Sequence, residues 1–295
     1  MILALIITHN RLSDLKICLE KVNSQSLSPD KILVIDNDSN DGTNEFLKKN
    51  NINNIYSKNN GSAGGWNIGI NYALKNNFNY IWMMDDDGYP DEFALENLHK
   101  NFYEDYSCLA SLILDSNDNS KLAIPLPFLN KKNNPVLFAF NRKIKSSKYF
   151  INNFKLYNFA NFFNGSLISI SSIKKIGNVN TNFFIYGEEV DFFHRLRKVG
   201  KVLTYSKAIH YHPNINKKWT RIKIYFYLKN SIYLNFKYYD YPIIRSILNI
   251  IAIFYRIIRY NGFLFFLRTF KYKNIKKIFN AVYKGFNSQI GNDFN

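Results

Sequence analysis

Cysteine is scarce in this sequence, whose 295 residues include only Cys18 and Cys108. The two do not form a Cys-x-x-Cys pair, so the sequence suggests neither a zinc ribbon nor a disulfide framework. Cys18 falls within an apolar helical pattern, where a free cysteine is usually a core residue. This use of cysteine predicts a protein of the reducing cytoplasm.

Acidic residues are also few, with 22 Asp and Glu against 39 Lys and Arg and a net charge of +17. The imbalance is concentrated near the C-terminus. Residues 214–295 hold 15 Lys or Arg against 2 Asp or Glu, a net charge of +13, whereas the other 213 residues carry only +4. The N-terminal part is nearly neutral, and the C-terminal part is strongly basic and rich in aromatic residues. This difference predicts two parts with different roles.

A long hydrophobic run is missing as well. Residues 243–267 are apolar, but Arg245, Arg256 and Arg259 interrupt them, and the longest uncharged stretch, Ser246–Tyr255, has ten residues. A membrane-spanning helix needs about 20. Arg245 and Arg256 nearly share one helix face, so we expect helices that lie on an anionic leaflet with Phe and Tyr inserted. Packing against the rest of the chain or a dimer partner is the structural alternative.

The first hundred residues alternate between strand and helix patterns. The first apolar run lacks a basic leader and a cleavage site, so we expect a buried strand rather than a signal peptide. Strands are predicted over Ile2–Ile7, Lys31–Ile35, Ile55–Ser57 and Tyr80–Met84, and helices around Leu15–Val22, Glu45–Lys49 and Asn67–Leu74. This alternation predicts an α/β fold with a mostly parallel sheet, helices on both faces, and ligands at the carboxyl ends of the strands. From Trp219 onward we expect helices.

Polar clusters begin where these strands stop. Thr8–Arg11 follows the first strand and suits contact with a nucleotide base or phosphate, although a helix-capping turn explains it equally well. Asp36 and Asn37 end the second strand and suit hydrogen bonds to a base or ribose. Glycines in Asn59–Gly69 would let backbone N–H groups approach an anion before a helix, but the Gly-Lys-Ser/Thr of a P-loop is missing.

Three adjacent carboxylates, Asp85, Asp86 and Asp87, close the apolar strand at Tyr80–Met84. They would repel one another unless a cation neutralised them. All-oxygen ligation suits Mg²⁺ or Mn²⁺, which also bridge phosphate oxygens. Because side chains alternate along an extended strand, we assign Asp85 and Asp87 to a metal–diphosphate site and turn Asp86 the other way. A solvated acidic turn is the structural alternative.

A second acidic cluster, Glu188, Glu189 and Asp191, lies among aromatic residues. Such surroundings raise the pKa of a carboxylate, which suits a general base. Arg195 follows Asp191 by four residues and would pair with it on a helix, which would make Asp191 structural.

Two histidines, His210 and His212, would share one face of a strand. One of them is expected to complete the metal shell. An ordinary packed histidine is the alternative at each position.

Taken together and in this order, the clusters resemble the family 2 glycosyltransferases, which have the GT-A fold. The resemblance covers about residues 1–213 and rests on Thr8–Arg11, Val34–Thr43, Asn59–Gly69, Met84–Pro90, Asn164–Ser166, Glu188–Arg195 and His212. The Asp85–Pro90 and Tyr227–Asn230 stretches look most like the galactofuranosyl- and rhamnosyltransferase branch.

The resemblance implies a role for each matched residue. Asp85 and Asp87 match a DxD-type motif that binds Mn²⁺ or Mg²⁺, with His212 as third ligand. Glu189 would be the catalytic base, with Glu188 and Asp191 as alternatives. The residues implied on the donor side are Thr8, Asn10, Arg11, Asp36, Asn37, Asn67, Asp85 and Asp86.

The implied reaction is an inverting, metal-dependent transfer. A sugar such as galactofuranose or rhamnose would move from a UDP- or dTDP-sugar to a hydroxyl of a surface glycan or lipid-linked acceptor, in the synthesis of a polysaccharide, lipopolysaccharide or capsule. Residues 1–213 would form the catalytic domain, with a donor half at 1–100 and an acceptor half at 101–213. Residues 214–295 would be a basic helical extension for a membrane surface or an oligomer. We expect a cytoplasmic protein, peripheral on the inner face of the cell membrane.

Three other functions fit parts of the pattern. RNA binding suits the charge of +17, but the basic residues lie away from the acidic clusters and no RNA- or DNA-binding motif occurs, so we expect no nucleic-acid partner. A sugar-nucleotidyltransferase should carry a glycine-rich motif after the first strand, where this chain has Thr8–Arg11. The retained carboxylates count against an inactive membrane scaffold.

Overall fold

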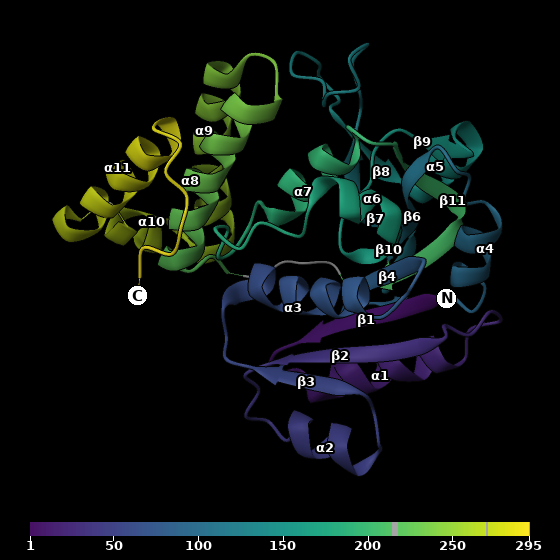
Figure 1. Cartoon of the computed structure of the whole chain (residues 1–295). Helices are drawn as coiled ribbons and strands as arrows, with labels where there is room; N and C mark the ends of the chain where they lie inside the picture. The colour runs from purple at the N-terminus through teal and green to yellow at the C-terminus, as the bar shows by residue number, and fades with distance from the viewer. Residues whose placement is uncertain (214–217, 270, 295) are drawn as a thin grey trace. The chain divides into compact units, whose positions relative to one another are not determined.

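A computed structural model describes residues 1–213, 218–269 and 271–294 of the chain (Figure 1). The chain forms two compact units. The first comprises residues 1–179 and 192–214, and the second comprises residues 180–191 and 215–295. The domain boundary expected between residues 213 and 214 stays a prediction.

The first unit is built on a sheet whose N-terminal strands are parallel. These strands, in spatial order, are β3 (Asn54–Ser57), β2 (Lys31–Asn37), β1 (Ile2–Thr8) and β4 (Tyr80–Asp85). The sheet continues with β10 (Asn164–Ser169), β6 (Tyr106–Asp115), β11 (Lys201–His212) and β5 (Tyr89–Pro90). β10 is antiparallel to both neighbours, and β11 is parallel to β6. The expected α/β fold with a mostly parallel sheet is confirmed.

Three further strands extend this frame. They are β7 (Asp118–Pro127) beside β6, β8 (Lys143–Ser146) beside β7, and β9 (Leu156–Tyr157) beside β11. Helix α5 (Ser147–Asn153) lies between β8 and β9.

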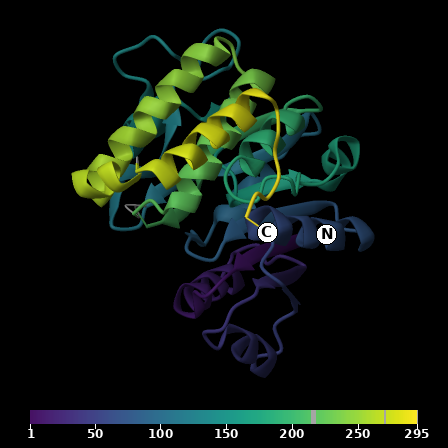
Figure 2. The same ribbon diagram turned by 90° about the vertical axis from the view of Figure 1, so that its left-hand side faces the viewer.

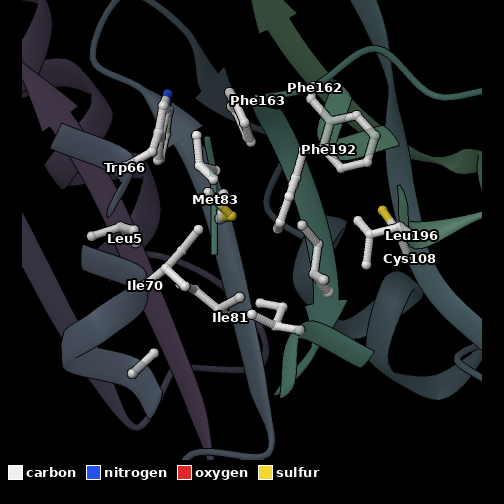
Figure 3. Close-up of a cluster of buried hydrophobic side chains, with 14 of the residues drawn as sticks. Leu5, Trp66, Ile70, Ile81, Met83, Cys108, Phe162, Phe163, Phe192 and Leu196 are labelled. Carbon is white, nitrogen blue, oxygen red and sulfur yellow. The ribbon is translucent and has the colours of Figure 1, made fainter. Parts of the chain in front are cut away.

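Helices cover both faces of the sheet because the side chains of β1 alternate between two cores. Leu3, Leu5 and Ile7 face one cluster, and Ile2, Ala4 and Ile6 face the other. The first cluster includes α3 (Gly61–Lys75) and α6 (Ile170–Ile176), and the second includes α1 (Leu12–Asn23), α2 (Thr43–Lys49) and α4 (Ala94–Lys100). Figure 3 shows Trp66 and Ile70 of α3 packed with Leu5 and Met83 of the sheet.

Of the glycines expected to face an anion, Gly65 and Gly69 lie inside helix α3, whereas Gly61 begins the helix and Gly64 lies in its first turn, so the anion-binding expectation stays a prediction. A Cβ atom on Gly69 would lie 2.4 Å from Cδ1 of Leu5, and one on Gly65 would lie 3.1 Å from Cδ1 of Ile7. Gly65 and Gly69 therefore let α3 approach β1 closely, which is a packing requirement.

The second unit is helical, as expected. It contains α8 (Arg221–Tyr238), α9 (Pro242–Asn261), α10 (Phe263–Thr269), α11 (Tyr272–Phe286) and the first turn of α7 (Glu188–Leu196). Helix α8 packs against both α9 and α11, which run beside it (Figure 2). Among the described helices, none is both long and apolar enough to cross a membrane.

Two of the three arginines of α9, Arg245 and Arg256, do not lie on an outward basic face, whereas Arg259 is exposed. Arg245 is buried and donates hydrogen bonds to Asp240. The guanidinium of Arg256 lies 6.0 Å from the ring centre of Trp219 and 5.7 Å from that of Tyr227. Both arginines therefore turn toward the interior of their own unit, because buried polar and aromatic partners are available there.

Candidate active site

Most of the residues predicted to bind the sugar donor lie at the carboxyl edge of the parallel strands of the first unit. Thr8 is the register partner of Asp36, and Ile7 is the partner of Asp85. The ends of β1, β2 and β4 therefore lie level with one another, which is where α/β sheets bind ligands.

Arg11 and Thr8 hold the carboxylates that follow β4. Thr8 Oγ1 donates to Asp86 Oδ2 at 2.8 Å, and Arg11 Nη1 donates to Asp86 Oδ1 at 2.8 Å. The same nitrogen lies 2.6 Å from Asp87 Oδ2. Strand β4 ends at Asp85, so the alternation assumed for an extended strand does not reach Asp86 and Asp87, and Arg11 contacts both.

His212 meets Asp87 from strand β11. Its Nε2 lies 3.1 Å from Asp87 Oδ1, and its Nδ1 donates to the carbonyl of Pro213 at 2.7 Å. Burial lowers the pKa of His212, but the hydrogen bond and the charge of Asp87 outweigh burial, so the pKa is raised overall. A carbonyl that fixes Nδ1–H leaves Nε2 as the nitrogen that faces the carboxylates, as in histidines that bind metals.

The ionised form of Asp85 is disfavoured by its surroundings. Burial raises its pKa to about 8, and the charges of Asp87 and Asp86 add to the effect, although His212 and Arg11 oppose it. The first unit therefore builds a carboxylate cluster that its own cations neutralise only in part, which favours a cationic ligand.

The residues present fit a divalent cation. Two ligands of an octahedral ion with bonds of about 2.1 Å lie about 3 Å apart, and the 3.1 Å spacing of Asp87 Oδ1 and His212 Nε2 matches this. No group of three His, Cys, Asp or Glu side chains in the described part of the chain has the arrangement of a complete metal site. The structure thus brings Asp87 and His212 together, and Asp85 as a further ligand stays a prediction.

His210 has a different environment from His212. It is fully buried, and burial together with the charge of His212 lowers its pKa to about 3. A Cβ atom on Gly88 would lie 2.5 Å from His210 Nε2, and one on Gly165 would lie 3.1 Å from Nδ1. His210 therefore packs as a neutral ring between two glycines, whereas the ring of His212 faces Asp87.

The end of β2 offers two buried hydrogen-bond acceptors. Asp36 Oδ1 accepts from the Ser39 N–H at 3.0 Å, and Asn37 Nδ2 donates to the Gly61 carbonyl at 3.2 Å. Among the residues that the structure describes, no donor reaches Asp36 Oδ2 or Asn37 Oδ1. Buried acceptors without donors are costly, so this position favours a ligand that carries N–H groups.

Asn10 and Asn67, also predicted on the donor side, are engaged by the protein. Asn10 Oδ1 accepts from the Asn40 N–H at 2.8 Å. Asn67 Nδ2 donates to the Val179 carbonyl at 3.3 Å, and its Oδ1 accepts from Asn71 at 3.0 Å. Both amides connect neighbouring segments of the first unit, and their contact with a donor stays a prediction.

The second acidic cluster begins α7 after a turn with left-handed backbone. Tyr186 has φ of 63° and Gly187 has φ of 108°. The Gly187 N–H donates to Glu189 Oε2 at 2.9 Å, and Glu188 is buried. A non-glycine residue with positive φ is strained and usually held by its surroundings.

Asp191 is committed to structural contacts within the second unit. It is 1% exposed, and its Oδ1 accepts from Lys237 Nζ at 2.9 Å and from the Tyr238 hydroxyl at 2.7 Å. Arg195, the partner expected from spacing, donates to the carbonyls of Ile176 and Gly177. Lys237 and Tyr238 thus hold Asp191 in place, and its role as a structural residue or as a base stays a prediction.

No role was predicted for Asn230, the residue of α8 that holds this turn. Asn230 Nδ2 donates to the Ile185 carbonyl at 3.1 Å and to the Tyr186 carbonyl at 2.7 Å. Asn230 is 1% exposed. The only available signal was its place in the Tyr227–Asn230 stretch, which carried a resemblance but no contact.

Comparison with known sequences identifies the family. The model of the family described as glycosyl transferase family 2 matches residues 4–162, more than half of the chain. Galactofuranosyltransferase GlfT1 of Mycolicibacterium smegmatis is 26% identical over 202 residues, which cover 67% of this chain and 65% of that protein. GlfT1 of Mycobacterium tuberculosis is 27% identical over 220 residues, covering 72% and 70%. This chain thus spans just under two thirds of the length of the first relative.

Solved structures share the fold at low identity. GalNAc-T7 with UDP, GalNAc and Mn²⁺ has a TM-score of 0.60 at 15% identity, covering 82% of this chain and 48% of its own. TarS residues 1–349 of S. aureus has 0.57 at 14%, covering 96% and 79%. The mannosyltransferase PcManGT from Pyrobaculum calidifontis in complex with GDP-Man and Mn²⁺ has 0.54 at 13%, covering 96% and 73%.

These findings confirm the expected GT-A fold and the expected glycosyltransferase class at the level of the family. The named relatives support the galactofuranosyl side of the predicted branch. On the evidence of the family model over residues 4–162, the chain belongs to glycosyl transferase family 2.

Proposed function

We propose that this chain transfers a sugar from a nucleoside diphosphate sugar to a hydroxyl of a glycan or lipid-linked acceptor, with inversion at the anomeric carbon. The observation that carries the proposal is the cluster of three adjacent carboxyl groups at Asp85–Asp87, which Arg11 contacts at Asp86 and Asp87 and His212 contacts at Asp87. Such a cluster at the carboxyl edge of a parallel sheet suits a metal–diphosphate.

Asp87 and His212 would hold a divalent cation, with Asp85 as a further ligand. When bound, Mn²⁺ or Mg²⁺ neutralises the charge that develops on the leaving diphosphate. Two of the structural neighbours are described with Mn²⁺, which supports this part of the proposal. Asp86 holds Arg11 in place, and Arg11 keeps its positive charge beside the diphosphate position.

Glu189 is proposed as the base, with Glu188 as the alternative. It removes the proton from the acceptor hydroxyl while that oxygen forms a bond to the anomeric carbon and the bond to the diphosphate breaks. Attack from the face opposite the diphosphate inverts the anomeric centre in one displacement. Asp191 is a positioning residue in this scheme, because its carboxylate is occupied by Lys237 and Tyr238.

The two acceptor oxygens at the end of β2 that lack a hydrogen-bond donor within the described chain favour a nucleobase that presents an N–H group. Uracil and thymine each present one ring N–H to Asp36 Oδ2 or Asn37 Oδ1, so a UDP- or dTDP-sugar is proposed as donor. The two relatives named as galactofuranosyltransferases favour galactofuranose. We place the reaction in the cytoplasm at the inner face of the cell membrane, where the basic residues 214–295 would meet anionic lipid.

Thermal unfolding with Mn²⁺ and a nucleotide panel tests the proposal. UDP or dTDP should raise the melting temperature only when Mn²⁺ is present, because a ligand that binds the native state stabilises it. GDP and CMP should have a smaller effect.

Two variants give this experiment its control. Asp87→Asn should lose the metal-dependent shift, whereas Asp105→Asn, an exposed acid of the same unit that pairs with Lys201, should keep it. Absence of any nucleotide-dependent shift in folded native protein would overturn the donor-site assignment.

A further inference from the structure

Helix α9 carries its apolar side chains on the outside. Its exposed large residues follow one another at intervals of three or four along one face, which we call the α9 strip: Ile243, Ile247, Ile251, Tyr255 and Ile258. Each is between 40% and 61% exposed. Residues three and four apart lie on one face of a helix, so the strip is continuous, and at about 1.5 Å per residue it runs for roughly 23 Å.

The opposite face of α9 packs inside the second unit, where it buries Ile253 and Ile257 as well as polar side chains. Ser246 is fully buried, donates to the Pro242 carbonyl at 2.7 Å and accepts from Asn235 Nδ2 of α8 at 3.2 Å. Arg245 is paired with Asp240, and Arg256 lies over aromatic rings. A helix at a water-exposed surface normally turns polar side chains outward, whereas the outer face of α9 is apolar. The strip is therefore a consequence of defined packing, and an exposed apolar surface of this extent indicates an interaction site.

The charge around the strip is positive and unbalanced. The only acids of residues 214–295 are Asp240 and Asp293. Asp240 pairs with Arg245, and Asp293 pairs with Lys229 and Lys284. Arg259, Arg268 and Lys271, at and beyond the C-terminal end of the strip, are exposed. The surface that accompanies the strip thus has cations available and acids that are already paired.

We propose that the α9 strip docks on an anionic lipid leaflet, with α9 lying flat and its isoleucines inserted among the acyl chains. Interfacial helices bind in this way, and nearby Lys and Arg add attraction to anionic headgroups. Phe263 and Leu264, which begin α10, are 59% and 70% exposed and extend the apolar surface beyond the strip. Tyr255 has the amphipathic ring that is enriched at membrane interfaces.

Charge distinguishes this occupant from a second copy of the chain. Self-association through the strip would bring two segments of net charge +13 against each other, and like charges across an interface oppose binding. An anionic leaflet has the opposite charge. The α9 strip specifies which residues would contact the membrane named under the proposed function. Its biological role rests on that proposed function.

Vesicle flotation of the full chain tests the docking surface without nucleotide, metal or acceptor. Failure here would leave the nucleotide experiment unaffected, so the two proposals fail separately. The probe is phosphatidylcholine vesicles with and without phosphatidylglycerol. The native chain should float with the anionic vesicles, more weakly with the neutral ones, and with partial loss of binding at high salt.

Two double variants locate the contact. Ile247→Ser with Ile251→Ser should weaken vesicle binding by on the order of tenfold to a hundredfold, while circular dichroism stays native because both positions are exposed. Ile17→Ser with Ile151→Ser removes isoleucines of the first unit that are 47% and 49% exposed, and should bind as the native chain does.

Three outcomes would overturn the proposal. They are a native chain that does not float, a strip variant that floats as well as the native chain, and a dimer in sedimentation velocity that the strip variant converts to monomer while vesicles have no effect. The last would assign the strip to a second copy.

Discussion

The two acidic clusters of the chain are handled differently. At Asp85–Asp87 three carboxylates share Arg11 and His212, and the pKa of Asp85 is raised to about 8, first by burial and then by its acidic neighbours. At Glu188–Asp191 the acids have separate surroundings: Glu189 accepts from the Gly187 N–H, and Asp191 accepts from Lys237 and Tyr238.

The difference indicates what each cluster does. Carboxylates left short of positive charge at a strand edge suit a ligand that brings cations, whereas carboxylates with partners of their own suit a fixed position. A run of adjacent acids in a sequence therefore does not indicate one particular role. The role depends on whether the fold supplies enough hydrogen-bond donors and cations for the carboxylates. Substitutions in one cluster at a time test this difference.

The largest effect is expected for Glu189→Gln. An isosteric amide keeps an oxygen for the Gly187 N–H but cannot remove a proton, so kcat should fall by about 10²- to 10⁴-fold. Binding of Mn²⁺ and UDP, measured by calorimetry, should be unchanged, because the proposed donor site lies in the first unit. A larger fall for Glu188→Gln than for Glu189→Gln would transfer the role of base to Glu188.

The next effect is expected for His212→Ala. The variant loses the imidazole beside Asp87 that is proposed to bind the metal, so its Mn²⁺ affinity should fall by about 10- to 100-fold. Calorimetry with UDP present measures this affinity. His99→Ala, which removes a histidine at the end of α4, is the matched control and should bind as the native chain does. Equal Mn²⁺ affinity in all three proteins would remove His212 from the metal site.

Much of the first cluster could be predicted from the sequence, because its parts are local. Apolar runs ending at Thr8, Asp36 and Asp85 predicted parallel strands, and parallel strands end at one edge. The packing role of Gly65 and Gly69 could not be predicted, because a glycine-rich segment suits both an anion loop and close helix packing. Contact with Leu5 decides between them, and that contact depends on the three-dimensional structure.

The second cluster was predictable only in part. Its acids were visible in the sequence, but the α8 residues that hold Asp191 and the turn before Glu188 lie more than forty residues away. The same holds for His210 and His212, which alternate on one strand and look equivalent in sequence. The two glycines around His210 and the carboxylate beside His212 distinguish them.

A moderate effect is expected for Asn230→Ala. Its amide holds two carbonyls of the turn before Glu188, so its loss should let the turn relax and lower kcat by about tenfold, with Mn²⁺–UDP affinity unchanged. Hydrogen exchange at Gly187 should accelerate. Asn235→Ala removes an equally buried amide of α8 that bonds to Ser246, and it should keep native exchange at Gly187. A fall in kcat that is the same in both variants would show that Asn230 contributes only to the general stability of the fold.

The smallest effect on catalysis is expected for Asp191→Asn. The amide oxygen still accepts from Tyr238, but the charge opposite Lys237 is lost, and Lys237 is exposed enough to reach water. We therefore expect a loss of about 1–3 kcal/mol in the free energy of unfolding, measured by urea denaturation, and a change in kcat of only a few-fold. A fall in kcat comparable with that of Glu189→Gln would show that Asp191 takes part in proton transfer, and the two acidic clusters would then differ less than their contacts indicate.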